Sequence, residues 1–135
     1  MIRGVNQVVL YVEDQEQAKR FWVDTMGFEL AEDSPYGEER WLSVRSPDGA
    51  MRLVLSKRQP GWSAGVEREG VPNSPVFFYA DDVEATYREL SAKGVKFPEP
   101  PAKQFFGWWS MFEDPDGTRY ALGQKWGTDA GADNG

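Results

Sequence analysis

The sequence DPDG at residues 114–117 follows a near copy, SPDG, at residues 46–49. Proline fixes φ at the second position of a tight turn, and glycine supplies the positive φ that a tight hairpin needs. The two stretches lie 68 positions apart, and the same spacing relates three further pairs of residues: Tyr11 and Tyr79, Asp14 and Asp82, and Trp41 and Trp109. One register therefore covers both halves of the 135-residue chain, and the sequence predicts an internal duplication.

The first half reads as a strand, a helix and three further strands. Residues 5–12 are rich in β-branched side chains and predict a strand. Its alternation predicts two faces, one with Val8, Leu10 and Val12 and the other with Gln7, Val9 and Tyr11. Asp14 has the position of a helix N-cap, and Gly27 has that of a helix end. The remaining strands are expected at residues 28–32, 40–45 and 51–56.

The second half repeats this order. A strand is expected at residues 76–80, with Asp82 as the N-cap of the helix and Gly94 at its end. Further strands are expected at residues 95–97, 105–112 and 120–124. The sequence thus predicts four segments: a first βαβββ module at residues 1–56, a linker at residues 57–73, a second βαβββ module at residues 74–126 and a disordered tail at residues 127–135.

The composition narrows the classes of function. A formal net charge of −7 argues against a nucleic-acid partner, because nucleic-acid-binding proteins present basic patches. No run of residues approaches the ~18 uninterrupted apolar residues of a membrane span, and residues 1–4 carry no signal-peptide pattern. The absence of Cys rules out disulfides, thiolate metal sites and cysteine nucleophiles, and it fits a reducing cytoplasm.

Together these segments predict an α+β fold. Each module is expected to form a curved, mostly antiparallel sheet with its helix on one face, which leaves the other face uncovered. Two such faces set together would make a cup, and a cup lined by alternate strand residues is a natural small-molecule site. Aromatic residues make up 14% of the chain, more than packing alone usually requires, so some of them are expected to line this site.

The paired modules and several short stretches resemble the vicinal oxygen chelate superfamily. These stretches are VED at residues 12–14, FW at 21–22, GF at 27–28 and the closing DPDG. The superfamily includes glyoxalase I, extradiol dioxygenases, fosfomycin-resistance enzymes and bleomycin-binding proteins. The resemblance covers residues 2–124, and it implies the fold more firmly than the function, because the superfamily spreads one scaffold over unrelated chemistries.

The resemblance also implies four metal-ligand positions, two in each half. In this sequence they correspond to Gln7, Leu53, Pro75 and Ala121, and we expect all four side chains to point into one cavity. A catalytic divalent ion needs about three nitrogen or carboxylate ligands from the protein. The chain contains no His, and the residues beside these positions offer no carboxylate. We therefore expect neither a metal nor another cofactor.

The candidate ligand-binding residues are those whose strand parity directs them into the cup. They are Gln7, Val9, Tyr11, Trp41, Leu53, Phe77, Tyr79, Trp109, Met111 and Ala121, with Phe106 and Trp108 at the rim. Gln7, Tyr11 and Tyr79 supply the polar contacts that would orient a ligand.

Two classes of function remain open at this point. The favoured hypothesis is a metal-independent small-molecule binding protein of the glyoxalase/bleomycin-resistance type, whose organic ligand is cationic or aromatic. The alternative is an enzyme of the glyoxalase/dioxygenase group (a lyase, isomerase or oxidoreductase) with an atypical or absent metal site. A third interpretation is a cup filled by the protein's own aromatic side chains. In each case we expect a homodimer, with Trp62 or residues 105–109 near the second subunit.

Overall fold

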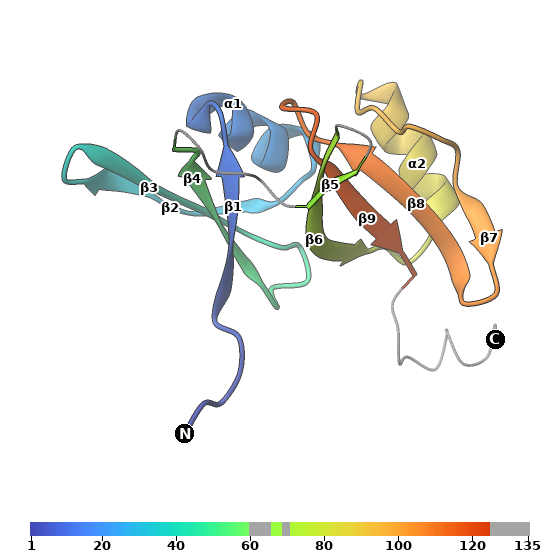
Figure 1. Ribbon diagram of the computed structural model, residues 1–135, viewed down its shortest axis with the longest axis horizontal. Helices are drawn as coiled ribbons and strands as arrows, with labels where there is room; N and C mark the ends of the chain where they lie inside the picture. The colour runs from blue at the N-terminus through green and yellow to red at the C-terminus, as the bar shows by residue number, and fades with distance from the viewer. Residues whose placement is uncertain (60–65, 69–70, 125–135) are drawn as a thin grey trace. The chain divides into compact units, whose positions relative to one another are not determined.

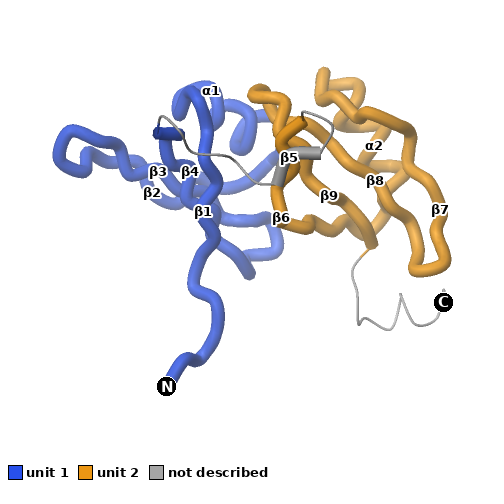
Figure 2. The backbone as a smooth tube through the Cα atoms, in the orientation of Figure 1, with its two compact units in different colours: residues 1–64 blue, residues 65–135 orange. Residues whose placement is uncertain are grey.

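The computed structural model describes residues 1–59, 66–68 and 71–124. The chain divides into two compact units, Met1–Ala64 and Gly65–Gly135 (Figure 2). Trp62 and the expected tail at residues 127–135 lie outside the described residues. None of the described helices is both long and apolar enough to cross a membrane.

Unit 1 is a βαβββ module. Its elements are β1 (Gln7–Val12), α1 (Gln15–Lys19), the π-helical segment η1 (Arg20–Thr25), β2 (Glu29–Tyr36), β3 (Glu39–Arg45) and β4 (Arg52–Lys57) (Figure 1). The sheet order is β1-β4-β3-β2. β1 runs parallel to β4, and the other two pairings are antiparallel.

Unit 2 repeats this topology and adds one strand. Its elements are β5 (Val66–Arg68), β6 (Val71–Tyr79), α2 (Val83–Ala92), β7 (Ala102–Gln104), β8 (Gly107–Glu113) and β9 (Arg119–Gly123) (Figure 1). The sheet order is β5-β6-β9-β8-β7, in which β6 and β9 are the parallel pair. The predicted α+β fold with two tandem βαβββ modules is therefore confirmed.

Equivalent aspartates begin the two helices. The Oδ1 atom of Asp14 accepts a hydrogen bond from the Gln17 N–H at 3.1 Å, and that of Asp82 accepts one from the Ala85 N–H at 3.0 Å. Each bond satisfies a backbone donor that the first helical turn leaves without a partner. Both caps agree with the sequence prediction.

The two Pro-Asp-Gly turns differ in length. In each turn the glycine N–H donates to the first residue, from Gly49 to Ser46 O at 2.8 Å and from Gly117 to Asp114 O at 2.9 Å. The first loop then closes with a bond from Ser46 N to Met51 O, whereas the second closes one residue earlier, from Asp114 N to Thr118 O. The spacing between equivalent residues is therefore 68 before the turns and 67 after them.

Each sheet buries one face against its helix. On the helix side of unit 1 the buried side chains include Leu10, Val12, Leu42, Val44, Leu53 and Leu55 of the sheet and Ala18, Phe21 and Trp22 of the helical segment. Ser43 and Val54, at the centre of the other face, are buried as well. In unit 2 the rings of Phe112 and Tyr120 are stacked at 5.4 Å, and Phe78 lies 5.7 Å from both. We call the opposite face of each sheet its helix-distal face.

Three segments depart from the sequence prediction. Residues 95–97 do not form a strand but only an isolated bridge between Lys96 and Glu113, and the short β7 takes the strand's place after the proline-rich residues 98–101. The expected linker at residues 57–73 contains β5 and the start of β6, which pair as a hairpin. The first helix changes at Arg20 from α to π geometry, in which the Met26 N–H donates to Phe21 O at 2.9 Å.

β3 and β4 separate beyond the pair Ser43 and Val54, and a side chain of α1 fills the gap in the ladder. The Nε2 atom of Gln15 donates to Leu55 O at 2.8 Å and to Arg40 O at 3.0 Å. The Gln15 amide thus donates to one carbonyl of each strand where the two strands no longer form hydrogen bonds with each other. The outer part of the β2–β3 hairpin extends from this point (Figure 1).

Candidate functional site

The strand register brings five of the predicted ligand-binding residues together on the helix-distal face of unit 2. Phe77 pairs with Ala121 and Tyr79 with Gly123 along the parallel ladder of β6 and β9. Across the antiparallel ladder, Ala121 pairs with Met111 and Gly123 with Trp109. Because paired residues direct their side chains to the same side of a sheet, these residues form two adjacent rows on one face.

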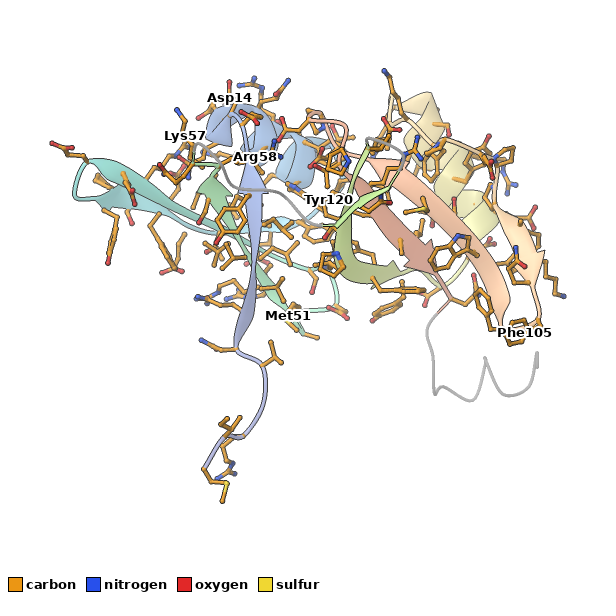
Figure 3. All side chains as sticks on the ribbon, viewed as in Figure 1. Asp14, Met51, Lys57, Arg58, Phe105 and Tyr120 are labelled. Carbon is orange, nitrogen blue, oxygen red and sulfur yellow. The ribbon has the colours of Figure 1, made fainter. Side chains whose placement is uncertain are left out.

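A chain of aromatic contacts crosses one end of this face. The ring centroids of Phe77 and Trp109 lie 5.3 Å apart with their planes at 67°, and those of Trp109 and Phe106 lie 6.1 Å apart at 83°. Phe106 continues to Phe105 at 5.1 Å. We call Phe77, Trp109, Phe106 and Phe105 the aromatic row. Phe77 is 46% exposed and Phe105, at the turn between β7 and β8 in Figure 3, is 100% exposed.

The other end of the same face is charged. Glu113 and Arg119 are a register pair of β8 and β9, and the Arg119 Nε lies 3.3 Å from the Glu113 Oε2. Along the face, the side chains therefore change from the ion pair at one end, through Met111 and Ala121, to the aromatic row at the other end. Such a face offers apolar area at one end and directional polar groups at the other, which is the usual composition of a small-molecule site.

Trp108 lies on the opposite face from the aromatic row. It is paired with Lys103 and precedes Trp109, so alternation directs it to the side of Ser110 and Phe112. The sequence prediction placed Trp108 at the rim of the cup with Phe106. The structure keeps only Phe106 beside Trp109.

The helix-distal face of unit 1 is built around a carboxylate. It carries Gln7 and Tyr11 of β1 and Trp41 of β3, as predicted from parity, together with a residue that the sequence did not single out, Glu32. The Oε1 atom of Glu32 accepts hydrogen bonds from the Trp41 Nε1 at 3.0 Å, the Ser43 Oγ at 3.1 Å and the Arg52 Nη1 at 3.1 Å. The bond from the Trp41 indole is the main cause that lowers the pKa of Glu32.

A β-bulge directs Glu32 to this face. Leu30 pairs with Val44, but the next pair is Glu32 with Ser43, so Ala31 is an extra residue in β2. Without the bulge Ala31 would face Ser43, and Glu32 would turn toward the buried side. The sequence predicted a strand at residues 28–32 but assigned Glu32 to neither face. The sequence holds one hint of the bulge. Glu29 and Glu32 are three positions apart in an eight-residue strand, a spacing that puts residues on opposite faces when alternation is regular.

The structure contradicts the predicted position of Leu53. Leu53 pairs with Val8 and is 1% exposed in the core, whereas Gln7 pairs with Arg52 on the helix-distal face. Leu53 and Gln7 therefore point to opposite faces, and the prediction that the four implied ligand positions converge is wrong. The error arises from applying the spacing of 68 beyond the turn, because the register makes Val54 the equivalent of Ala121.

The residues present do not fit a divalent metal. Val54 and Ala121 carry no donor atom, and Gln7 has a cationic neighbour in Arg52, which disfavours a second positive charge. The fourth position, Pro75, lies in the irregular part of β6 between Asn73 and Phe77. Within the described parts of the chain, no three His, Cys, Asp or Glu side chains are grouped so that they could hold a metal ion.

Known proteins are similar to this chain in sequence and fold. A family model described as the Glyoxalase/Bleomycin resistance protein/Dioxygenase superfamily matches residues 4–122. The Bacillus subtilis (strain 168) protein YetH is 32% identical over 123 residues, which make up 90% of this chain and 98% of YetH.

Two solved structures extend the comparison. One is a member of the same superfamily from Sphaerobacter thermophilus DSM 20745, with a TM-score of 0.79, 27% identity, and coverage of 92% of this chain and 98% of that chain. The other is TnmS3, an antibiotic binding protein from Streptomyces sp. CB03234, with a TM-score of 0.75, 33% identity and the same two coverages. The resemblance found in the sequence is thereby confirmed, and the chain belongs to the glyoxalase/bleomycin resistance protein/dioxygenase superfamily.

Proposed function

We propose that this chain is a metal-independent small-molecule binding protein of the glyoxalase/bleomycin-resistance type. The observation that carries the proposal is the aromatic row, in which Phe77 and Phe105 remain 46% and 100% exposed. Exposed aromatic surface of this kind costs free energy in water, and a bound organic ligand recovers part of that cost by covering it. The ion pair of Glu113 and Arg119 supplies polar groups at the far end of the face.

Two further observations support an organic ligand. The net charge of −7 favours a neutral or cationic molecule over an anion. TnmS3, which is 33% identical to this chain, is an antibiotic binding protein. Antibiotic binding is a property of TnmS3. The similarity makes drug-like molecules the first class of ligand to test on this chain.

The test is a calorimetric screen of neutral and cationic drug-like compounds on protein dialysed against EDTA. We expect binding that EDTA leaves unchanged and that Phe77→Ala and Trp109→Ala each weaken by about tenfold or more. Tyr36→Ala is the matched control, because Tyr36 is an exposed aromatic residue of unit 1 that is not among the candidate ligand-binding residues. A tightly bound stoichiometric metal after purification, or conversion of a ligand into a product detected by mass spectrometry, would overturn the proposal in favour of the enzyme alternative.

We also propose that the chain is a cytoplasmic homodimer. The absence of Cys supports a reducing compartment. Exposed aromatic side chains in unit 2 and the position of β1 at the edge of its sheet support association between copies. Light scattering is expected to give about twice the chain mass of 15.3 kDa, and a single-chain mass at micromolar concentration contradicts the dimer.

A further inference from the structure

Gly123 leaves room for a neighbouring ring. A Cβ atom at position 123 would lie 3.0 Å from the Cε1 and 3.1 Å from the Cζ of Phe77, and 3.3 Å from the backbone oxygen of Trp108. These distances are shorter than ordinary van der Waals contact, so the Phe77 ring occupies the space that a side chain would fill. Phe77 pairs with Ala121 rather than Gly123, so its ring leans along β9 by one row.

This placement fixes the geometry of the aromatic row. Trp109 pairs with Gly123 across the β8–β9 ladder, and the ring that lies over Gly123 meets Trp109 at 5.3 Å and 67°. The two rings therefore hold an edge-to-face arrangement, which suits their quadrupoles, and Phe77 keeps 46% of its surface exposed. An aromatic ring held in this way offers a flat surface with an upright aromatic neighbour at its side.

Unit 1 has a different residue at the same place. Tyr11 pairs with Ser56 just as Tyr79 pairs with Gly123, so Ser56 is the equivalent of Gly123. The equivalent of Phe77 there is Val9, which has no ring to accommodate. The glycine and the ring thus occur together in unit 2 and are both replaced in unit 1.

We propose that the ligand of the aromatic row is a flat, fused aromatic ring system, and that Gly123 is the positioning residue that selects it. The inference rests on the proposed function, because it names the class of ligand for the same face. A flat ring stacks on the exposed side of Phe77 while its edge faces Trp109, and both contacts add to the area that it buries. A saturated cage of similar polarity buries area but has no ring face to stack, so it gains less.

The test compares two cationic probes on the full chain, flat 9-aminoacridine and the saturated cage amine amantadine. We expect the parent to bind 9-aminoacridine more tightly by about three- to tenfold. Gly123→Ala should abolish this preference by displacing the Phe77 ring, and Ser56→Ala, its matched control, should leave it unchanged. The ratio of the two dissociation constants is the readout, because a general loss of stability would weaken both probes alike.

Phe77→Leu provides a second route if Gly123→Ala unfolds the sheet. It keeps apolar volume above Gly123 but removes the ring, so the preference for the flat probe should disappear while weak binding of both probes remains. Three results overturn the inference and leave the proposed function standing. They are equal affinity of the parent for the two probes, a preference that a folded Gly123→Ala variant retains, and a parent that binds another screened compound but neither probe. A parent that binds neither probe and no compound of the drug-like screen overturns both.

Discussion

The helix-distal faces of the two units have the same strand order but differ in their central side chains. In unit 1, Val9, Ser43 and Ser56 stand where unit 2 has Phe77, Met111 and Gly123. The equivalent tryptophans show the divergence most directly. The indole N–H of Trp41 donates to Glu32, whereas the ring of Trp109 lies between the rings of Phe77 and Phe106.

The buried faces diverge much less. Both are mainly apolar, with Ser110 of unit 2 as a buried polar exception, and each is closed by a helix whose N-cap is an equivalent aspartate. The comparison teaches that the requirements of packing hold the two modules to one pattern on the helix side. On the helix-distal side the same scaffold tolerates a carboxylate network in one copy and an aromatic row in the other.

The largest expected effect tests this division between core and distal face. Phe112→Ala removes a fully buried ring that stacks on Tyr120, so the free energy of unfolding should fall by about 3–5 kcal/mol. Phe105→Ala, at a fully exposed ring of the same unit, should change stability by less than about 0.5 kcal/mol. Urea denaturation measures both, and similar losses for the two variants would remove the distinction.

The second effect concerns Asp114, the first residue of the turn in unit 2, which is buried, whereas the equivalent Ser46 of unit 1 is half-buried. Burial raises the pKa of Asp114 to about 6, although its Oδ1 accepts hydrogen bonds from the N–H groups of Thr118 and Asp116. The folded state then holds a proton that the unfolded state releases near pH 3.8, so stability contributed by this group falls as pH rises from about 4 to about 6. The loss amounts to about 2–3 kcal/mol, since each pKa unit corresponds to about 1.4 kcal/mol.

Asp114→Asn should remove this pH dependence while keeping the acceptor for Thr118 and a partner for Tyr120. The measurement is the difference in unfolding free energy between parent and variant across pH 4–7, which cancels the titration of Glu32 and Asp33. Ser46→Ala, at the equivalent turn position of unit 1, is the control and should show no such trend. A constant difference across this range contradicts the assignment to Asp114.

A smaller effect separates the two tryptophans. Trp41→Phe keeps a ring but deletes the donor to Glu32, so it should lower stability more than the equivalent change in unit 2. Trp109→Phe keeps the aromatic contacts of its row and should cost less than about 0.5 kcal/mol. Thermal unfolding of the two variants side by side is the measurement, and a reversed order would show that the tryptophans do not differ in role.

The smallest effect tests whether Glu29 belongs to the hydrogen-bonded group around Glu32, which we call the carboxylate network. Arg45 and Glu29 approach only to 3.5 Å, and the Glu29 side chain is 73% exposed. Glu29→Gln should therefore change stability by less than about 0.3 kcal/mol. A chemical denaturation curve that coincides with that of the parent is the expected result, and a clear loss would extend the network to the edge of β2.

Local patterns predicted most of the fold, whereas the site depended on features that break those patterns. The N-caps at Asp14 and Asp82 and the two Pro-Asp-Gly turns are determined by residues within a few positions of one another, so the sequence was sufficient for them. Parity also placed Phe77, Tyr79 and Trp109 correctly on one face, because β6 and β8 alternate regularly there.

The rest depended on single extra or missing residues. The bulge at Ala31 turned Glu32 to the helix-distal face, and the shorter second turn shifted the equivalence of Ala121 from Leu53 to Val54. Each of these one-residue changes moves the following side chains to the other face of the sheet. Neither change is visible in the sequence, because composition and spacing stay nearly the same. The early start of β6 was not predicted because Pro72 falls within the expected linker at residues 57–73, although β6 accommodates it.

Slow deamidation of Gln15 would loosen the hairpin of β2 and β3 as the protein ages. Its amide donates to one carbonyl of β3 and one of β4 at the point where the strands separate. Deamidation would replace this donor group with a carboxylate, and the bridge between two carbonyl oxygens would become a repulsion among three acceptors. An aged sample should therefore exchange the backbone amide hydrogens of the outer β2–β3 hairpin faster than a fresh one, and Gln15→Glu would reproduce the aged state at once.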